Sequence, residues 1–427
     1  MTDIELRIRI IQSLVEVPAA TWDACAHSKD EPSSVEAIAP VVKPIHEDKL
    51  SSREDNLSTD LSTRGYVDNP FISHDFLSSL EASGSVGGRS GWQPRHLLAE
   101  DACGTLLGAA PCYVKSHSRG EYVFDHGWAE AFERAGGDYY PKLQVAVPFT
   151  PVTGPRLLVR PGPLAGTIRG SLADALVEVT TASELSSAHV IFLTEPEWRA
   201  LGKRGFLQRT DQQFHWDNAG YATFEDFLAA LSSRKRKTIR RERKEALEPS
   251  IEVSWLTGSD LTEAVWDAFF AFYMDTGSRK WGSPYLTRAF FSIVADKMRD
   301  RILLVMAKRA GRWIAGALNF LGRDTVYGRN WGAIEHHPFL HFELCYYQAI
   351  DYAIHHKLSR VEAGAQGEHK LARGYLPKTT YSAHFIANPA LRRAVAEYLS
   401  RERAYVRAAG AELAAAAPFR KDLVEQD

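Results

Sequence analysis

The sequence predicts a mixed α/β (α+β) protein built from two similar halves. The chain has 427 residues, of which 45% are hydrophobic and 24% charged, so it can bury a sizeable core and more than one domain. Strand-like and helix-like segments follow one another in the same order twice along the chain. A short sequence motif also recurs at the end of each half. These observations predict a first domain at residues 1–220 and a second at 221–427.

The composition narrows the class of protein. A formal net charge of −2 gives no general attraction to nucleic acid or to an anionic membrane. The four cysteines are irregularly spaced, which is typical of a reducing compartment rather than of a disulfide framework. No uncharged apolar run approaches the ~20 residues of a membrane span. We therefore expect a cytoplasmic protein without a membrane span, and the sequence indicates no particular oligomeric state.

The first half is expected to open with a strand within residues 1–11, where Ile4, Leu6 and Ile8 alternate with charged side chains. A helix at 20–26 follows. Residues 28–69 are rich in Ser, Asp, Glu and Pro and contain one Tyr but no Phe or Trp, so they predict a mobile insertion. This insertion is either a solvated loop or a lid over a site.

The other elements follow from alternation and helical periodicity. In the first half the expected strands lie at 97–100, 106–114, 122–125, 143–147, 190–193 and 206–216, with helices at 171–185 and near Trp198. In the second half they lie at 302–307, 313–321, 325–331, 360–363 and 379–386, with a helix at 340–356. A basic helix within 224–247 links the halves, and an Ala-rich helix at 389–416 ends the second.

The recurring motif indicates duplication. Residues 204–207 read RGFL and residues 373–376 read RGYL, and a basic residue, Thr, His and an aromatic residue follow both in identical register. In each unit the strand–helix–strand crossover requires its two strands to be parallel. This order of elements is that of the Gcn5-related acyltransferase fold. We therefore predict tandem acyl-CoA N-acyltransferase-like domains.

Ligands of parallel α/β units bind beyond the carboxyl ends of the strands. In the second half one such end carries Asn330 and Trp331, and its parallel neighbour is followed by residues 366–370. The residues expected to bind substrate there are Asn330, Trp331, Gln366 and Lys370. His369, oriented by Glu368 or Glu343, is a candidate for a catalytic base, or else a structural histidine.

Glu343 lies in the first turn of the 340–356 helix and on its inward stripe, together with Tyr347. Such a carboxylate is either a base for an attacking amine or an acid satisfied by the free amides of the helix. Tyr347 and Tyr381 are candidate acids for the leaving group. A metal site is not expected, because the acidic, histidine and cysteine residues at 336–345 match no known zinc spacing.

The linking helix carries eight basic residues between 234 and 244. It is either a solvated face or a dock for phosphates of coenzyme A, of a nucleotide-linked acceptor or of tRNA. The candidate phosphate-binding residues are Arg236, Lys237, Arg240, Arg241 and Lys244.

The first half carries polar residues at its own strand ends. They bind an acceptor across the interface between the halves, or they form ion pairs and caps within the half. These residues are Asp125, His126, Tyr139, Tyr140, Lys142 and Gln144.

Several of these segments resemble one bacterial family. The segments are NPF (69–71), GWQPRH (91–96), EYVFD (121–125), YYPKLQ (139–144), HFE (341–343) and GAQGEHK (364–370). Together they resemble the FemAB-like predicted N-acyltransferases, the peptidoglycan biosynthesis or recognition proteins, over nearly the whole chain from residue 69 to about 399.

The resemblance implies a tandem acyltransferase-like fold without a tightly bound cofactor. It implies transfer of an acyl or aminoacyl group from acyl-CoA or aminoacyl-tRNA, with tRNA as a partner in the second case. The acceptor would be an amine of a small or nucleotide-linked molecule such as a peptidoglycan precursor. The chain has neither the long helical arm of Fem enzymes nor an Arg/Gln-x-x-Gly-x-Gly loop after Trp331, so both donors stay open. The alternatives are a non-catalytic recognition protein and a metal-dependent hydrolase.

Overall fold

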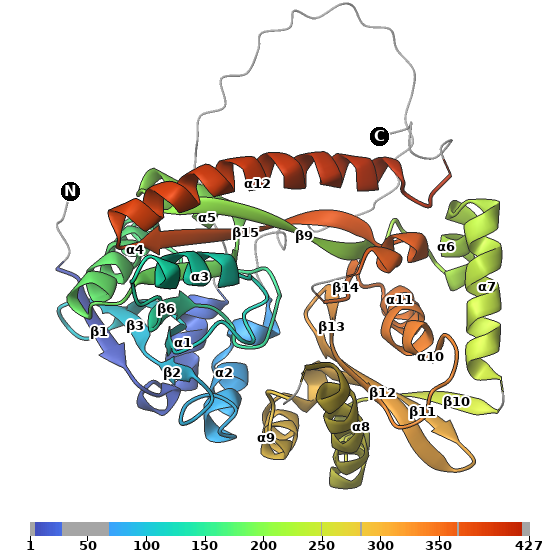
Figure 1. Cartoon of the computed structure of the whole chain (residues 1–427). Coiled ribbons are helices and arrows are strands. Elements are labelled where there is room, and N and C mark those ends of the chain that lie inside the picture. The colour runs from blue at the N-terminus through green and yellow to red at the C-terminus, as the bar shows by residue number, and fades with distance from the viewer. Residues whose placement is uncertain (1–4, 28–67, 249, 282–283, 365–366, 421–427) are drawn as a thin grey trace, which may run out of the picture.

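The computed structural model describes residues 5–27, 68–248, 250–281, 284–364 and 367–420. A long mixed sheet runs through the molecule, and helices cover both of its faces (Figure 1). The predicted insertion at 28–69 lies outside the described residues apart from Asp68 and Asn69. Within the described ranges, none of the helices is long and apolar enough to cross a membrane.

The first half contains nine strands and five α-helices among the described residues. The strands are β1 (Arg7–Ile11), β2 (Trp92–Pro94), β3 (His96–Glu100), β4 (Leu106–Ala110), β5 (Cys112–Lys115), β6 (Lys142–Val145), β7 (Leu158–Val159), β8 (Ser187–Leu193) and β9 (Leu207–Asp217). The helices are α1 (Ala19–Ala26), α2 (His74–Ala82), α3 (His126–Arg134), α4 (Ala165–Ala182) and α5 (Glu195–Lys203).

The second half begins with two linking helices, α6 (Phe224–Ala230) and α7 (Ser233–Leu247). Its strands are β10 (Ile251–Leu256), β11 (Ile302–Arg309), β12 (Arg312–Leu321), β13 (Thr325–Ala333), β14 (Arg360–Glu362) and β15 (Leu376–Ile386). Its other helices are α8 (Glu263–Trp281), α9 (Arg288–Met298), α10 (Leu340–Phe342), α11 (Gln348–His355) and α12 (Pro389–Ala415).

The predicted α/β fold with two similar units is confirmed, and both predicted crossovers place parallel strands side by side. Strand β6 pairs in parallel with β8, and β13 pairs in parallel with β14. The large sheet has the order β10-β11-β12-β13-β14-β9-β15-β8-β6-β5-β2, and a smaller sheet has the order β1-β3-β4-β7.

Two predicted strands differ from the structure. The expected strand at 106–114 is divided at Pro111, which donates no backbone hydrogen bond, and the resulting β4 and β5 belong to different sheets. The expected strand at 122–125 is a turn. Its Tyr122 has φ 64°, a left-handed conformation that a continuous strand excludes.

The halves exchange their last strands. Strand β9 is the last strand of the first half in sequence but pairs with β14 and β15 of the second half. Strand β15 ends the second half and pairs with β9 and with β8 of the first half. In Figure 1 these two long strands cross the top of the molecule side by side, beneath α12.

The exchange follows the internal repeat. Strands β9 and β15 have 11 residues each, and both come directly after the repeated motif. Asp211 lies opposite Thr380 in the β9–β15 ladder, and each is the fifth residue of its strand. Corresponding positions of the two units therefore meet at this pair, as they do at an approximate two-fold axis.

Aromatic packing also joins the halves away from the exchanged strands. The ring of Phe71, which lies just before α2, is 5.2 Å from that of Phe320 on β12 and 5.3 Å from that of Tyr327 on β13. Rings at this spacing and in edge-to-face geometry are favourable contacts. They hold the first half against the strand that forms one side of the candidate site.

Candidate active site

Strands β13 and β14 part after a short parallel ladder. Thr325, Val326 and Tyr327 pair with Arg360, Val361 and Glu362, and the ladder ends there. In the neighbouring β12–β13 ladder the register shifts at Asn319, so that Arg329 is an extra residue on β13. A bulge of this kind bends its strand, and bulges are common beside active sites.

A pocket of about 100 Å³ lies where the strands part. Its walls come from strands β12 and β13 and from the start of the helix that connects β13 to β14, here called the crossover helix. It is lined by Ala317, Leu318, Asn319, Gly328, Arg329, Asn330, Trp331, His341, Cys345, Tyr346 and Ala363. The predicted substrate residues Asn330 and Trp331 are both among them.

A larger pocket of about 430 Å³ shares Trp331 and His341 with the first one. Its other walls come from α8, from the end of β13 and the loop after it, and from α10. They are formed by Thr276, Ala333, Glu335, His336, His337, Phe339, Leu340 and Phe342. Because two residues border both spaces, a ligand with a small head and a longer body could occupy them together.

Tyr346 at the smaller pocket is hydrogen-bonded to His369, an exposed residue that is not among those lining either pocket. The hydroxyl of Tyr346 lies 2.9 Å from Nε2 of His369, and Tyr346 itself lines the pocket. Burial lowers the pKa of His369, and Arg373 and Lys370 lower it further. Burial also raises the pKa of the Tyr346 hydroxyl. At neutral pH this pair therefore consists of a neutral imidazole and a protonated phenol.

A π-helical turn positions Tyr346. The crossover helix is π-helical over Glu343–Tyr347, between α10 and α11. A π turn contains one residue more than an α turn, so it changes which side chains face a given side. Here Tyr346 reaches the pocket, whereas Tyr347 points to Glu242, to which it donates a hydrogen bond.

Glu343 is fully buried in an ion pair. Its two carboxylate oxygens accept hydrogen bonds from Arg243 on α7 at 3.1 and 2.9 Å, and Gln348 donates a third at 2.7 Å. Burial raises the pKa of Glu343, while Arg243 and Gln348 oppose that shift. The carboxylate thus anchors α7 to the crossover helix. Its role as a base stays a prediction.

The loop after β14 is described in part. Gln366 and the side chain of Glu368 lie outside the described residues. Lys370 is buried, donates from Nζ to the carbonyl of Gly364 at 3.0 Å, and has its pKa lowered to about 8 by burial. Tyr381 lies on β15, where its ring packs 5.1 Å from that of Trp198 of the first half.

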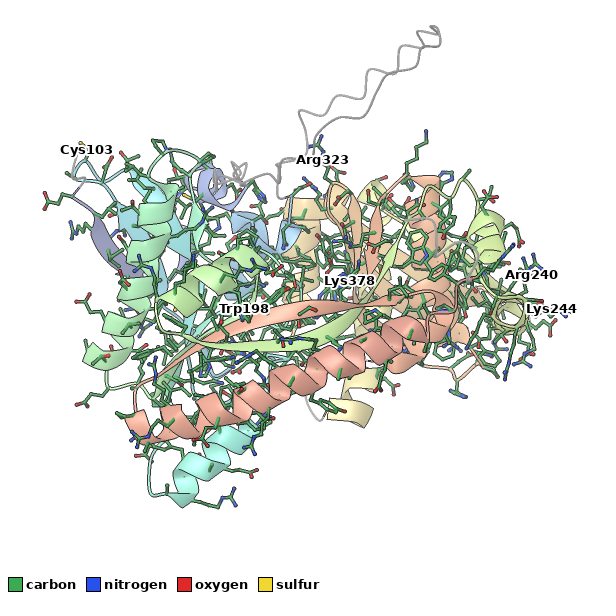
Figure 2. All side chains as sticks on the ribbon, turned by 90° about the horizontal axis from the view of Figure 1, so that it is seen from above. Cys103, Trp198, Arg240, Lys244, Arg323 and Lys378 are labelled. Atoms are coloured by element: carbon green, nitrogen blue, oxygen red, sulfur yellow. The ribbon has the colours of Figure 1, made fainter. Side chains whose placement is uncertain are left out.

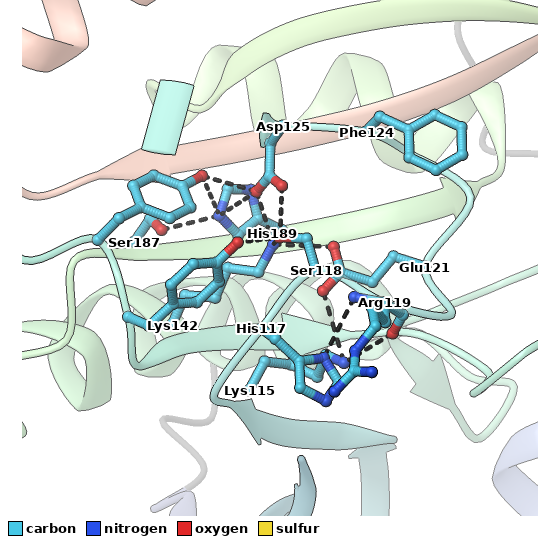
Figure 3. Close-up of polar contacts among 12 residues, drawn as sticks. Lys115, His117, Ser118, Arg119, Glu121, Phe124, Asp125, Lys142, Ser187 and His189 are labelled. Carbon is cyan, nitrogen blue, oxygen red and sulfur yellow. Dashed lines mark hydrogen bonds and ion pairs between the residues drawn. The ribbon is translucent and has the colours of Figure 1, made fainter. Parts of the chain in front are cut away.

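The polar residues of the first half form a buried network (Figure 3). Nζ of Lys142 lies 2.6 Å from Asp125, 2.8 Å from Glu121 and 2.8 Å from the hydroxyl of Ser118. Tyr139 donates to Asp125 at 2.7 Å. These side chains bind one another rather than solvent, and only Oε1 of Glu121 in this group has no hydrogen-bond partner among the described residues.

Histidines extend this network to the exchanged strand. His189 on β8 lies 2.7 Å from His384 on β15, and burial lowers the pKa of both rings, that of His189 to about 3. His126 is exposed at the start of α3 and stacks on Phe124. The side chain of Gln144 is fully buried and has no hydrogen-bond partner among the described residues.

Tyr140 belongs to the edge of the same network. Its hydroxyl lies 2.8 Å from that of Ser118, and burial raises its pKa. The predicted acceptor residues of the first half are therefore brought together, apart from His126 and Gln144.

The corresponding strand ends of the first half are filled by its own chain. Strands β6 and β8 pair only through Leu143–Val145 and Ala188–Val190. The loop beyond β6 returns to β8, where Gly154 donates to the carbonyl of Phe192. The fully buried Arg156 donates to the carbonyls of Ile191 at 2.9 Å and Val152 at 2.6 Å. The second half therefore offers the better candidate for an active cleft.

The predicted phosphate-binding residues lie on α7. Figure 2 shows Arg240 and Lys244 at one end of the molecule, pointing outward. Lys237, Arg240, Arg241 and Lys244 are exposed and Arg236 is partly buried. Ion pairs with Glu225, Glu245 and Glu248 partly neutralise this face.

Sequence reasoning missed several residues that border the site. Asn319 and Tyr346 line the smaller pocket, and Glu362 ends β14 with Oε1 3.8 Å from Nδ1 of His215. A polar residue inside a largely apolar strand was the available signal for Asn319. No sequence signal marks the π turn that selects Tyr346.

Histidines and acidic residues gather near the larger pocket. Among the described residues, no group of three or more His, Cys, Asp or Glu side chains is arranged to hold a metal ion. Glu335 instead pairs with His337 at 2.9 Å and with Arg309 at 2.7 Å, and both contacts lower its pKa.

Several solved structures are similar to this chain at low identity. The crystal structure of FemX is 10% identical with a TM-score of 0.46, and the alignment covers 75% of this chain and 93% of that one. L-PGS from Bacillus licheniformis is 8% identical with a TM-score of 0.46, covering 75% of this chain and 95% of that one. A tandem GNAT protein from the clavulanic acid biosynthesis pathway is 11% identical with a TM-score of 0.42, covering 90% and 99%.

Family comparison gives a more specific result. No curated protein matches the chain in sequence. The family model named FemAB-like, described as peptidoglycan biosynthesis/recognition, matches residues 51–421, which is most of the chain. The chain therefore belongs to the FemAB-like family.

Proposed function

We propose that this protein transfers an acyl or aminoacyl group from an activated donor to an amine, in the pocket between the parted strands β13 and β14. The observation that carries the proposal is the hydrogen bond from Tyr346, which lines that pocket, to His369, together with the larger pocket that adjoins the smaller one. Membership of a family described by peptidoglycan biosynthesis or recognition supports an acceptor of the peptidoglycan-precursor class.

In the proposed reaction the acceptor nitrogen attacks the acyl carbonyl. The new C–N bond forms, the bond from the acyl carbon to its carrier breaks, and the proton lost by the amine passes to the carrier. His369, neutral because burial lowers its pKa, accepts the proton of the amine. Tyr346, whose hydroxyl lies 2.9 Å from that imidazole, delivers a proton to the leaving group. The chemistry needs no metal ion.

Strand β13 supplies the proposed oxyanion site. Beyond Tyr327 its edge has left the β14 ladder, so backbone amides there are available to an anionic oxygen. Glu343 is the alternative base, but we assign the role to His369 because Arg243 and Gln348 already bind that carboxylate.

The carrier of the acyl group is coenzyme A or tRNA in this proposal. Both present phosphates, and the exposed basic face of α7 is the surface that we assign to them. Arg236, Lys237, Arg240, Arg241 and Lys244 supply its positive charge.

The proposal is tested by transfer assays with acyl-CoAs and aminoacyl-tRNAs against amine acceptors, followed by mass spectrometry. Tyr346→Phe and His369→Ala are expected to lower turnover by about 100-fold or more, the usual contribution of acid–base catalysis, with melting temperatures within a few degrees of the parent. Tyr405→Phe is the matched control, because Tyr405 is 74% exposed on α12. Full activity in both site variants would refute this assignment. Ligand binding without turnover by any donor would favour a recognition protein.

A further inference from the structure

A buried amide borders the smaller pocket. Asn319 on β12 is 1% exposed and is one of the residues that line the space. Its Nδ2 donates to the backbone carbonyls of Leu303 and Ala317, both at 3.2 Å. Because both partners are acceptors, the orientation of the amide is fixed, and its oxygen cannot face them.

The oxygen of this amide is left without a partner. Oδ1 of Asn319 has no hydrogen-bond partner among the described residues. It lies beside Gly328, since a Cβ atom added there would be 3.4 Å from Oδ1, and Gly328 also lines the pocket. Buried acceptors are normally satisfied, so a ligand that brings an N–H or O–H group gains a hydrogen bond that an apolar ligand cannot make.

Two other polar groups on the pocket wall are already engaged. Tyr346 is bound to His369, and the guanidinium of Arg329 donates to the carbonyl of Phe149 in the first half. Asn319 therefore offers an uncommitted acceptor among the residues that line this space. The pocket, at about 100 Å³, holds only a small group.

We infer that Asn319 is a specificity-determining residue for the transferred group. The acyl group that fits is small and carries a hydrogen-bond donor next to its carbonyl, as a glycyl or glycolyl group does and an acetyl group does not. This inference rests on the proposed function and deepens it, because it names the class of acyl group without choosing its carrier.

The test compares acyl groups that differ in one position. Glycyl, glycolyl and acetyl groups are attached by amide bonds to 3′-amino-3′-deoxyadenosine, and the same three groups to an amide analogue of coenzyme A. Binding to the full chain is measured by titration calorimetry. On whichever carrier binds, the glycyl or glycolyl compound is expected to bind about tenfold tighter than the acetyl compound, the effect of one hydrogen bond to a buried acceptor.

Gly328→Ala isolates the role of the oxygen. Its methyl group would cover Oδ1 while leaving both hydrogen bonds of Nδ2 intact, so the tenfold preference should fall below about threefold. Asn319→Leu should have the same effect if the variant folds. Gly166→Ala is the matched control, because a Cβ atom there meets open space on α4, and it should keep the parental preference.

The outcomes separate the two hypotheses. Equal binding of all three acyl groups, as expected if only solvent meets Oδ1, overturns the inference but leaves the proposed function standing. If the glycyl or glycolyl compound still binds more tightly than the acetyl compound after Gly328→Ala, the inference is also overturned and the proposed function again stands. Failure of all six compounds to bind overturns the proposed function and this inference with it.

Discussion

Glu362 shows how a single buried carboxyl affects the whole chain. It is 7% exposed, and its Oε2 has no hydrogen-bond partner among the described residues. Burial raises its pKa from 4.5 to about 7, and Arg360 offsets only part of this shift. A carboxyl whose folded-state pKa is raised holds its proton more tightly in the folded state. Its contribution to stability is therefore complete below pH 4.5 and is lost as the pH rises toward 7.

Glu362→Gln should consequently leave stability nearly unchanged at pH 4 and raise it at pH 8. The expected gain is up to about 3 kcal/mol, from roughly 1.4 kcal/mol per pKa unit. Urea unfolding at the two pH values measures the difference. Glu252→Gln, at an exposed position of β10, is the control and should show no such pH dependence. A gain of equal size at both pH values would contradict the argument.

The location of a single residue can be predicted from the sequence where it depends only on the position of that residue along a strand. Asn330 and Trp331 could be placed at the pocket because strand ends in a parallel crossover face one cleft. The partners of Lys142 could not be predicted, because Glu121 and Asp125 come from a turn that resembles a strand in its residue pattern. Long-range pairing of buried charges depends on tertiary packing, which local pattern does not contain.

At the scale of elements, α7 has two different faces. Arg243 points inward to Glu343, which is fully buried, whereas Arg240 pairs with Glu225 on the exposed side. A basic run in the sequence does not distinguish these faces. Only the packing of α7 against the crossover helix does.

Arg243→Leu should destabilise the protein by about 3–5 kcal/mol, because it leaves the buried Glu343 without its cation. Arg240→Leu on the same helix should change stability by less than about 1 kcal/mol, since both members of that pair are exposed. Thermal unfolding of both variants measures the contrast. Equal destabilisation by the two variants would show that the buried Arg243–Glu343 pair stabilises the protein no more than the exposed Arg240–Glu225 pair does.

The exposed face of α7 is expected to bind the phosphates of the acyl carrier and to contribute little to folding stability. Replacing Lys237, Arg241 and Lys244 by Ala should weaken donor binding and reduce its salt dependence, because fewer counterions are released from the phosphates. Titration of the donor at two salt concentrations gives the result. Replacing Arg199, which is 68% exposed on α5, serves as the control. Unchanged affinity and salt slope would remove α7 from the donor site.

The crossover helix illustrates the limit of periodicity. A regular 3.6-residue period correctly predicts its extent and its buried stripe, including Leu344 and Ile350. The π turn at Glu343–Tyr347 adds one residue, so the tyrosine at the pocket is Tyr346 rather than Tyr347. Such a turn is selected by tertiary contacts and leaves no repeat in the sequence.

For the whole molecule, the repeat predicts two similar units but not the exchange of their last strands. Nothing in the periodicity of β9 or β15 indicates which neighbour each will pair with. The domain division at residue 220 remains a prediction. It would leave β9 without any strand partner in its own half, since both partners, β14 and β15, come later in the chain.

Fragments 1–220 and 221–427 should therefore not fold separately but should associate when produced together. Co-expression with an affinity tag on one fragment tests this by co-purification of the other. Circular dichroism and proteolysis of each fragment alone supply the comparison. A stable, cooperatively unfolding fragment on its own would show that the exchanged strands are dispensable.

The exchange also sets the order in which the protein can mature on the ribosome. When β8 has emerged, the edge that will receive β15 stays open until residue 386 has been made, almost 200 residues later. Open strand edges attract other chains. The open edge of β8 in the nascent first half thus needs protection during this interval, and it is covered only by β15, which is translated after all of its neighbours in the large sheet.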